Sequence, residues 1–284
     1  MILKDVQVVP MSFPDYRAAP GLNWSKVKYA RRAASFARYK QDNPHEGSIE
    51  GRAIHALVLE PDAFWREFVL SPYDSFTTKA AREWRDEQVA QVIKQKEYDN
   101  CVAAAEAVKR SPLGSKLLEG ARCELTVLGT LEVDGTDYPV KCRLDLVSGV
   151  GILVDLKTTD ALTTDEVVRR ELTKLDYIGQ AAFYFEMAVA AGLPAQAWGW
   201  LFVNLKTHDV FGIDVDDDDL AFGGEMWRKA FATYIGALRS GEWKGALPDD
   251  QFTRVRLPDW YKRDSEADVA EDDDDADELG FWGE

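Results

Sequence analysis

Three short segments of alternating polarity, joined by two tight turns, constrain the fold of this chain most strongly. The segments are CELTVLGTLEV (123–133), DYPVKCRLDLV (137–147) and GILVDLKTT (151–159). Their β-branched and apolar residues favour strands, and both Asp134-Gly135 and the SGVG sequence at 148–151 are typical of turns. Three consecutive strands with short connections predict an antiparallel meander.

Helical patterns lie on both sides of these strands. Before them, residues 26–40 suit a helix that Asn23 or Ser25 could cap, residues 51–61 carry a helical apolar stripe, and residues 77–109 are mostly helical in pattern. After them we expect a short helix with a capping box of Thr163 and Glu166, and then a helix over about 176–191. Two more strands follow in AWGWLFVNLKT and HDVFGIDV, and a last helix over about 216–241. This order predicts an α+β (mixed α/β) fold whose central, mostly antiparallel sheet is flanked by helices.

The composition indicates one folded domain followed by an acidic extension. Hydrophobic residues make up 46% of the 284 residues, which excludes wholesale disorder. Eleven acidic residues and no Lys or Arg lie in residues 264–284, so most of the net charge of −16 belongs there and a nucleic-acid partner is not excluded. We expect a single domain over 1–263 (a helical part at about 20–120, a core at about 121–215 and a helix at about 216–241) and a disordered tail over 264–284.

The three cysteines and the N-terminal sequence indicate the compartment. Cys101, Cys123 and Cys142 have no CxxC spacing, which argues against a disulfide framework or a four-cysteine metal site. The sequence MILKDVQVVPMSF has no signal-peptide pattern, and no run approaches 18 uncharged apolar residues. We therefore expect a soluble cytoplasmic protein.

Asp155 and Lys157 stand two residues apart in the third strand, so their side chains share one face. Asp145 ends the preceding strand, and the short turn can bring it beside Asp155. Two adjacent carboxylates repel each other unless a cation lies between them, and oxygen ligands favour Mg²⁺ or Mn²⁺. Glu124 can supply a third carboxylate, with Glu132 as a competitor. The alternative interpretation is an ordinary ion pair on a surface strand.

The segment at residues 26–40 is the most basic part of the chain. It contains six basic residues and no acid, interleaved with three aromatic residues. Its candidate phosphate contacts are Lys26, Lys28, Arg31, Arg32 and Arg38, with a solvated helix face as the alternative. Arg143 shares the strand face of Asp145, and it could either reach a phosphate or pair with that carboxylate.

Taken together, these segments resemble the PD-(D/E)XK nuclease superfamily, and more closely the phage and prophage exonucleases of the exodeoxyribonuclease VIII (RecE-like) group. The resemblance covers roughly residues 20–205 and rests on GRAIHALVLEP, CELTV, CRLDLV, ILVDLKTT and DYIGQAAFYFEMA, which occur in the family's order. It implies a restriction-endonuclease-like core. Leu144, where the family often has proline, and Asp155, where glutamate is common, depart from the pattern without removing an oxygen ligand.

The resemblance also implies roles for individual residues. The implied metal ligands are His55, Glu124, Asp145, Asp155 and the backbone carbonyl of Leu156; the implied catalytic groups are Lys157, Asp155, Asp145, Glu124, Gln180 and Tyr184. For His55 on an apolar helix, and for Tyr184 in an apolar run, a place in the core is the alternative.

The function that this resemblance implies is a Mg²⁺-dependent exonuclease, with Mn²⁺ as a substitute, that degrades linear double-stranded DNA from 5′ to 3′ and leaves single-stranded overhangs for phage-type recombination. It further implies a homo-oligomeric ring, a single-strand annealing protein as partner, and the cytoplasm of a bacterial host. One alternative is a non-processive DNA endonuclease or repair nuclease on the same core. The other is an interaction module that acts through the acidic tail and its Leu279, Phe281 and Trp282.

Overall fold

The computed structural model describes residues 1–44, 47–161, 163–257 and 259. The chain divides into two compact units, Met1–Lys244 and Gly245–Glu284, and every element below belongs to the first. The acidic tail expected at residues 264–284 lies outside the described residues. Across the part of the chain that the structure describes, no helix combines the length and the apolar character that crossing a bilayer requires.

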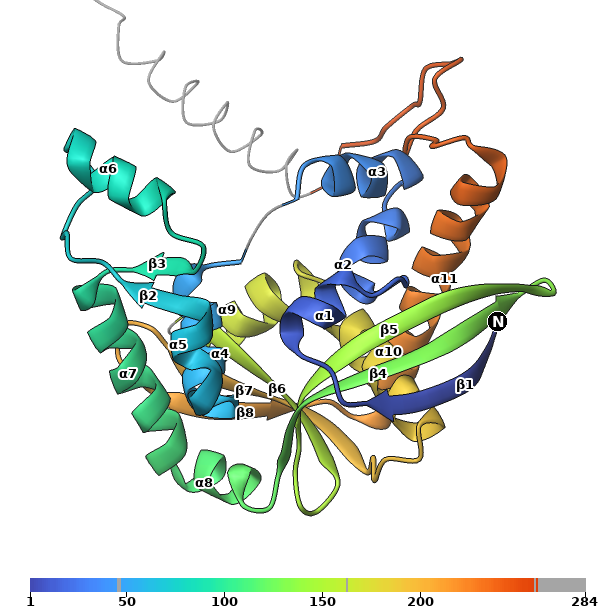
Figure 1. Cartoon of the computed structure of the whole chain (residues 1–284). Coiled ribbons are helices and arrows are strands. Elements are labelled where there is room, and N and C mark those ends of the chain that lie inside the picture. Colours follow the sequence, from blue (N-terminus) through green and yellow to red (C-terminus); the bar gives the residue numbers. More distant parts are fainter. Residues whose placement is uncertain (45–46, 162, 258, 260–284) are drawn as a thin grey trace, which may run out of the picture. The chain divides into compact units, whose positions relative to one another are not determined.

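A six-stranded sheet forms the centre of the first unit (Figure 1). Its strands, in spatial order, are β1 (Ile2–Val9), β4 (Arg122–Val133), β5 (Thr136–Val147), β6 (Ile152–Thr159), β7 (Ala197–Asn204) and β8 (Val210–Asp214). All neighbours pair antiparallel except β6 and β7, which are parallel. The predicted meander is therefore confirmed as β4, β5 and β6. Strand β1 was not anticipated, because a register shift around Asp5 interrupts its alternation.

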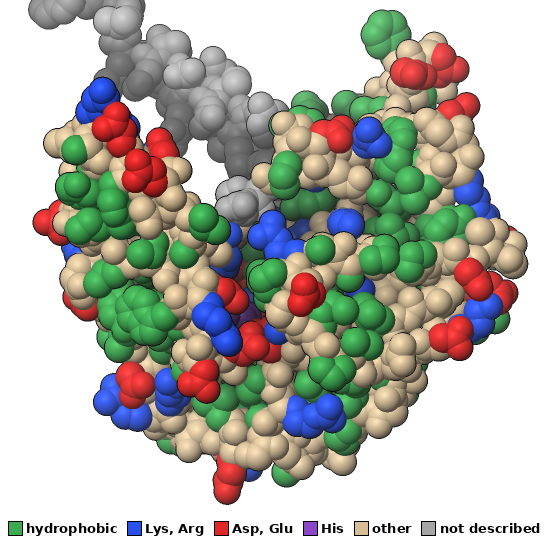
Figure 2. Space-filling view, viewed as in Figure 1, with side chains coloured by type: hydrophobic (Ala, Val, Ile, Leu, Met, Phe, Trp, Pro, Cys, Tyr) green, Lys and Arg blue, Asp and Glu red, His purple; other side chains and the backbone are tan. Residues whose placement is uncertain are grey.

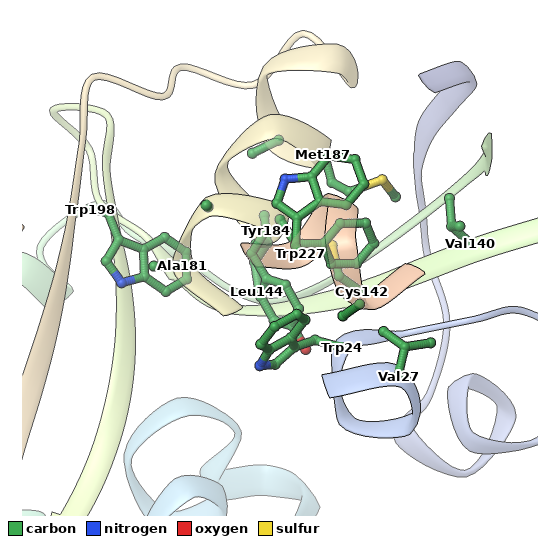
Figure 3. Close-up of a cluster of buried hydrophobic side chains, with 14 of the residues drawn as sticks. Trp24, Val27, Val140, Cys142, Leu144, Ala181, Tyr184, Met187, Trp198 and Trp227 are labelled. Carbon is green, nitrogen blue, oxygen red and sulfur yellow. The ribbon is translucent and has the colours of Figure 1, made fainter. Parts of the chain in front are cut away.

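Helices pack on both faces of the sheet and enclose two hydrophobic cores. A tryptophan-rich core, containing Trp24, Trp198, Trp200 and Trp227, lies against α10 (Tyr177–Ala190) and α11 (Asp217–Ser240) (Figures 1 and 3). A second core lies against α4 (Ile49–Leu59), α7 (Gln95–Arg110) and α8 (Pro112–Leu118). Alternation along β6 separates them, since Leu153 belongs to the first core while Val154 and Leu156 belong to the second.

The crossover between the parallel strands contains α9 (Thr164–Val167), a π-helical turn η3 (Val168–Thr173) and α10. The predicted capping box is present, because the amides of Thr163 and Glu166 each donate to the other's side chain at 3.3 Å. A second, two-stranded sheet pairs β2 (Phe68–Leu70) with β3 (Gln91–Ile93). The stretch over 77–109 is mostly helical, as expected, and the three-residue strand β3, which was not predicted, lies between α6 (Lys79–Asp86) and α7.

The predicted helix over residues 26–40 is in fact three segments. They are α2 (Trp24–Val27), the 3₁₀ turn η1 (Lys28–Arg31) and α3 (Ala34–Asp42), with Asn23 as the cap of α2. Trp24, Val27 and Ala30 are buried at intervals of three residues. That spacing matches a 3₁₀ helix, in which residues three apart lie on one line, better than an α-helix. Ala33, with extended backbone, then separates η1 from α3.

Gly179 lets the indole of Trp24 lie directly against α10, and it provides a test of this packing. A Cβ at this position would lie 2.3 Å from a ring carbon of Trp24. Gly179→Ala should therefore lower the free energy of unfolding by about 1–3 kcal/mol through overpacking, measured by urea denaturation. Gly236→Ala in α11 is the matched control, because its Cβ would meet nothing within 4 Å. The control should be neutral or stabilising by up to about 1 kcal/mol, and an equal loss in both variants would contradict the packing.

Candidate active site

The candidate active site lies where β5 and β6 separate. The two strands pair only at Leu146 with Val154 and at Val147 with Leu153. If this register continued, Asp145 would face Asp155, as the sequence predicts. Figure 1 shows β5 and β6 diverging from the bottom of the sheet. We call this point the fork.

The fork leaves the backbone of Leu156 without a strand partner on the β5 side, and two side chains take that place. The amide of Leu156 donates to Asp145 Oδ2 at 2.8 Å, and its carbonyl oxygen lies 2.5 Å from His55 Nε2. A buried backbone polar group needs such a partner. Gly51 lets α4 approach β6 closely, since a Cβ there would lie 3.3 Å from Thr158 Oγ1. The GxxxH spacing from Gly51 to His55 therefore has a packing reason.

Glu124 enters the site through an unusual backbone conformation. It has a φ of 52°, a left-handed value that costs a non-glycine residue about 1 kcal/mol or more. The strand changes face here, because Leu125 packs against the tryptophan-rich core and Cys123 against the second core. The facing strand changes in the same way between Leu144 and Leu146. Strain at this position indicates a functional constraint on Glu124.

His55, Glu124 and Asp145 form a group that could hold a metal ion. One ligand atom from each lies within 4.8 Å of the others, and all three side chains are half-buried. His55 Nδ1 is 3.9 Å from Glu124 Oε1, and His55 Nε2 is 3.7 Å from Asp145 Oδ2. Two carboxylates, one imidazole and the Leu156 carbonyl suit a cation such as Mg²⁺ or Mn²⁺. Figure 2 shows acidic and basic side chains gathered around a hollow on this face.

The raised pKa values of Asp145 and His55 also indicate a site that favours added positive charge. Burial and the neighbouring carboxylate of Asp155 raise the pKa of Asp145 to about 7. Burial lowers the pKa of His55, but the charges of Asp145 and Glu124 outweigh burial and raise it to about 9. Protons thus compensate the clustered negative charge when no metal is present.

Metal binding should release protons from this site. A histidine must be neutral to bind a metal, so a cation has to displace the proton of His55 between pH 7 and its pKa of about 9. The dissociation constant of Mn²⁺ should therefore fall about tenfold per pH unit from pH 7 toward 9. Calorimetry in buffers of different ionisation heat measures the protons released. His208→Gln should leave this dependence unchanged, and a pH-independent affinity would contradict the assignment of His55.

Asp155 and Lys157 lie beside this three-residue group. Lys157 Nζ is 2.5 Å from Asp155 Oδ2, and Gln180 Nε2 donates to Asp155 Oδ1 at 2.9 Å. Asp155 is almost completely buried, at 2% exposure. Burial lowers the pKa of Lys157, but Asp155 and its neighbours outweigh burial and raise it, so the ammonium form is retained. Lys157 Nζ also lies 4.5 Å from the ring centre of Tyr177, which lies in the DYIGQAAFYFEMA segment but for which the resemblance implied no role.

The structure places Tyr184 in the hydrophobic interior. Its ring packs against Phe183 and Trp198 in the tryptophan-rich core (Figure 3), and burial raises its pKa well above the usual value. Tyr184 and Gln180 are one helical turn apart, but only Gln180 has a hydrogen bond to Asp155 among the described contacts. A catalytic role for Tyr184 remains a prediction, and these surroundings favour the core alternative.

Arg143 pairs with glutamates rather than with Asp145. Its guanidinium lies 2.5 Å from Glu124 Oε2 and 3.3 Å from Glu60 Oε2, and it donates to Thr126 Oγ1 at 2.8 Å. Arg143 reaches across to β4, whereas Asp145 accepts the amide of Leu156 on β6. Its side chain is only 6% exposed, so its interactions orient Glu124. Glu132, the competing acid, pairs with Lys4 instead.

All five basic residues of the 26–40 segment that were proposed as phosphate contacts bind the protein itself. The structure gives these partners: Lys26 to the Gly21 carbonyl, Lys28 to the Leu175 carbonyl, Arg31 to the Asp176 carboxylate, Arg32 to the Lys174 carbonyl, and Arg38 to Asp42. Three of the five thus hold the turn that precedes α10. Asp176 is buried with a left-handed φ of 59°, and its carbonyl accepts the indole N–H of Trp24. Nothing near residues 26–40 in the sequence identifies this distant partner.

Comparison with known families agrees with this geometry. Residues 29–240 match the family described as a PDDEXK-like domain of unknown function (DUF3799). The chain belongs to this family. The match includes the fork, its carboxylates and Lys157, so this PDDEXK-like domain has the mixed α+β fold predicted from the sequence.

Two solved structures are similar to this PDDEXK-like chain. One, from Eubacterium rectale, was described as a candidate exonuclease; it is 15% identical, with a TM-score of 0.55 over 88% of this chain and 97% of that one. The other is an alkaline exonuclease from Laribacter hongkongensis, 14% identical, with a TM-score of 0.30 over 67% of this chain and 93% of that one. A search of curated proteins finds no significant match. The Eubacterium structure supports the fold.

Proposed function

We propose that this chain is a metal-dependent nuclease that hydrolyses phosphodiester bonds of DNA. The observation that carries the proposal is the fork, which gathers His55, Glu124 and Asp145 beside the Asp155–Lys157 pair. A structural ion pair would not need three further ionisable groups around one backbone carbonyl. Perturbed ionisable groups clustered in this way are typical of active sites.

The residues at the fork have separable tasks in this proposal. A divalent cation would be held by His55, Glu124, Asp145, Asp155 and the Leu156 carbonyl, and when bound it would polarise a phosphoryl oxygen and lower the pKa of a water molecule. The Lys157 ammonium stabilises negative charge that develops on the phosphoryl oxygens or orients the attacking water. Gln180 holds Asp155 in position, and Arg143 does the same for Glu124.

The finer features of the proposal come from the resemblance to RecE-like exonucleases. They are Mg²⁺ as the natural cation with Mn²⁺ as a substitute, 5′-to-3′ degradation of linear double-stranded DNA, single-stranded overhangs for phage-type recombination, a homo-oligomeric ring, a single-strand annealing partner, and a bacterial cytoplasmic location. The Eubacterium protein, which was described as a candidate exonuclease, supports exonuclease activity through analogy of fold alone.

Digestion of labelled DNA tests the proposal. Linear duplexes carrying a label at one 5′ or one 3′ end, and covalently closed circles of the same sequence, are incubated with Mg²⁺, with Mn²⁺ or with EDTA. A 5′-to-3′ exonuclease releases the 5′ label first as a mononucleotide and leaves the circles intact. Cleaved circles would support the endonuclease alternative. Intact DNA under every metal condition would overturn the proposal.

A further inference from the structure

A row of basic and aromatic side chains begins at Lys28, which holds the turn before α10, and its other members have no part in the site described above. It consists of Lys28, Tyr29, Phe36, Tyr39 and Lys40, which we call the basic-aromatic row. The rings of Tyr29 and Phe36 meet edge to face at 5.2 Å, and those of Phe36 and Tyr39 lie nearly parallel, at 12°, with centres 6.4 Å apart. Two lysines that bind the same rings complete the row.

Core packing does not explain these rings. Among the described residues, Tyr29 contacts the tryptophan-rich core, whereas Phe36 and Tyr39 belong to neither core. Tyr39 is 57% exposed. Phe36 is half-buried beside it on α3, a helix with no acid before Asp42, so the two rings form an accessible aromatic surface among basic residues.

The lysines of the row lie on its rings rather than on acids. Lys40 Nζ is 5.5 Å from the ring centre of Tyr29 and 5.7 Å from that of Phe36, and Lys28 Nζ is 5.2 Å from that of Tyr29. No ion pair with a described acidic residue is formed by either lysine. Neither positive charge is therefore neutralised by an ion pair with a described acid, although Lys28 also donates to the Leu175 carbonyl.

The row is connected to the active site through one turn. Lys28 donates to the carbonyl of Leu175, and two residues later the ring of Tyr177 lies under Lys157 Nζ. Burial lowers the pKa of Lys28; the charge of Asp176 opposes this shift, and the charges of Lys157, Arg32 and Lys40 add to it. Lys28 thus links the two places, since it contacts the turn before Tyr177 and shares the Tyr29 ring with Lys40. In Figure 2, basic side chains adjoin the hollow in the region of α2 and α3 (compare Figure 1).

We propose that the basic-aromatic row binds single-stranded DNA, with unpaired bases stacked on Tyr39 and Phe36 and the phosphates beside Lys40 and Lys28. This proposal rests on the proposed nuclease function and deepens it, because it identifies where the single DNA strand that enters or leaves the fork is bound. Ring faces alternating with cations are how proteins hold single strands without reading sequence. In a duplex the base faces are already covered by neighbouring bases, so exposed rings favour unpaired DNA over duplex DNA.

Fluorescence anisotropy of a labelled oligo(dT) strand, in EDTA so that no hydrolysis occurs, tests the row. Tyr39→Leu should weaken binding at least about fivefold, since stacking of one base on one ring contributes about 1–3 kcal/mol. Tyr39→Phe should restore binding, because it keeps the ring. Lys40→Gln should instead reduce the slope of log affinity against log salt by about 0.7 per lost phosphate contact. Phe222→Leu in α11, equally exposed at 57%, is the matched control.

An abasic strand of the same length separates stacking from charge. On this strand Tyr39→Leu should bind like the unchanged protein, whereas Lys40→Gln should still lose affinity. If the unchanged protein and Tyr39→Leu bind oligo(dT) equally, the proposal that the row binds single-stranded DNA is overturned, even if the protein degrades DNA. If Tyr39→Leu loses binding but the unchanged protein does not degrade DNA, single-strand binding by the row is supported and the proposed nuclease function is rejected.

Discussion

Lys157→Ala is expected to reduce the rate of DNA hydrolysis at least about a hundredfold while leaving metal binding intact. The ammonium group of Lys157 lies 2.5 Å from Asp155 and cannot itself bind a cation. Its catalytic contribution is to stabilise charge or orient water, and removal of such a group costs about 10²–10³ in rate. The affinity for Mn²⁺ should be unchanged or higher, because the variant removes a cation that competes for Asp155.

The matched control for this prediction is Lys206→Ala. Lys206 is 64% exposed and pairs with Asp160, away from the fork, so its loss should change neither rate nor metal affinity. Rates are measured as acid-soluble nucleotides released from linear duplex, and Mn²⁺ affinity by calorimetry. A fully active Lys157→Ala variant would remove Lys157 from the mechanism. Loss of Mn²⁺ binding in that variant would mean that Lys157 maintains the structure of the site.

Asp145→Asn is expected to lose activity and metal binding but to gain stability. The neutral side chain keeps an oxygen that can accept the amide of Leu156, yet it removes a ligand charge from the group with His55 and Glu124. We expect a rate at least about a hundredfold lower and markedly weaker Mn²⁺ binding. The variant thus separates the catalytic role of Asp145 from its structural one.

The stability gain of Asp145→Asn follows from the raised pKa of this carboxyl. Because the folded state holds the proton up to about pH 7, above the value for an unfolded chain, ionised Asp145 destabilises the fold as the pH rises. Urea denaturation in EDTA should therefore show the variant more stable at pH 8 and nearly equal to the unchanged protein at pH 4. Asp137→Asn, exposed on the same strand, should show no such gain. If Asp145→Asn is no more stable than the unchanged protein at pH 8, repulsion between the carboxylates at the fork is contradicted.

Local periodicity was sufficient to predict five of the six strands of the central sheet, all except β1, and half of the site. Asp155 and Lys157 share a face because alternation in β6 is regular. The short turn between β5 and β6 brings Asp145 near Asp155, although the strands separate before these two residues could pair. The family resemblance added His55, which α4 carries from far away in the sequence. The contact of His55 with the Leu156 carbonyl agrees with that implication.

The features that the sequence did not predict depend on backbone irregularities or distant partners. The left-handed backbone of Glu124 inverts the alternation of β4, which a regular strand pattern cannot anticipate. Arg143 bonds across to β4 instead of along its own strand. Asp176, 145 residues from Arg31, binds a side chain that the basic composition had indicated for DNA. In each case the partner is chosen by tertiary packing, which composition and spacing do not encode.

Anomalous diffraction from crystals of the protein soaked in Mn²⁺ tests the central claim most directly, since it locates the metal without relying on activity. The account predicts a single strong peak at the fork, within bonding distance of Asp145, of the Leu156 carbonyl, and of at least one of His55, Glu124 and Asp155. A peak bound only by other residues, or no peak at a concentration that saturates Mn²⁺ binding in solution, would contradict it.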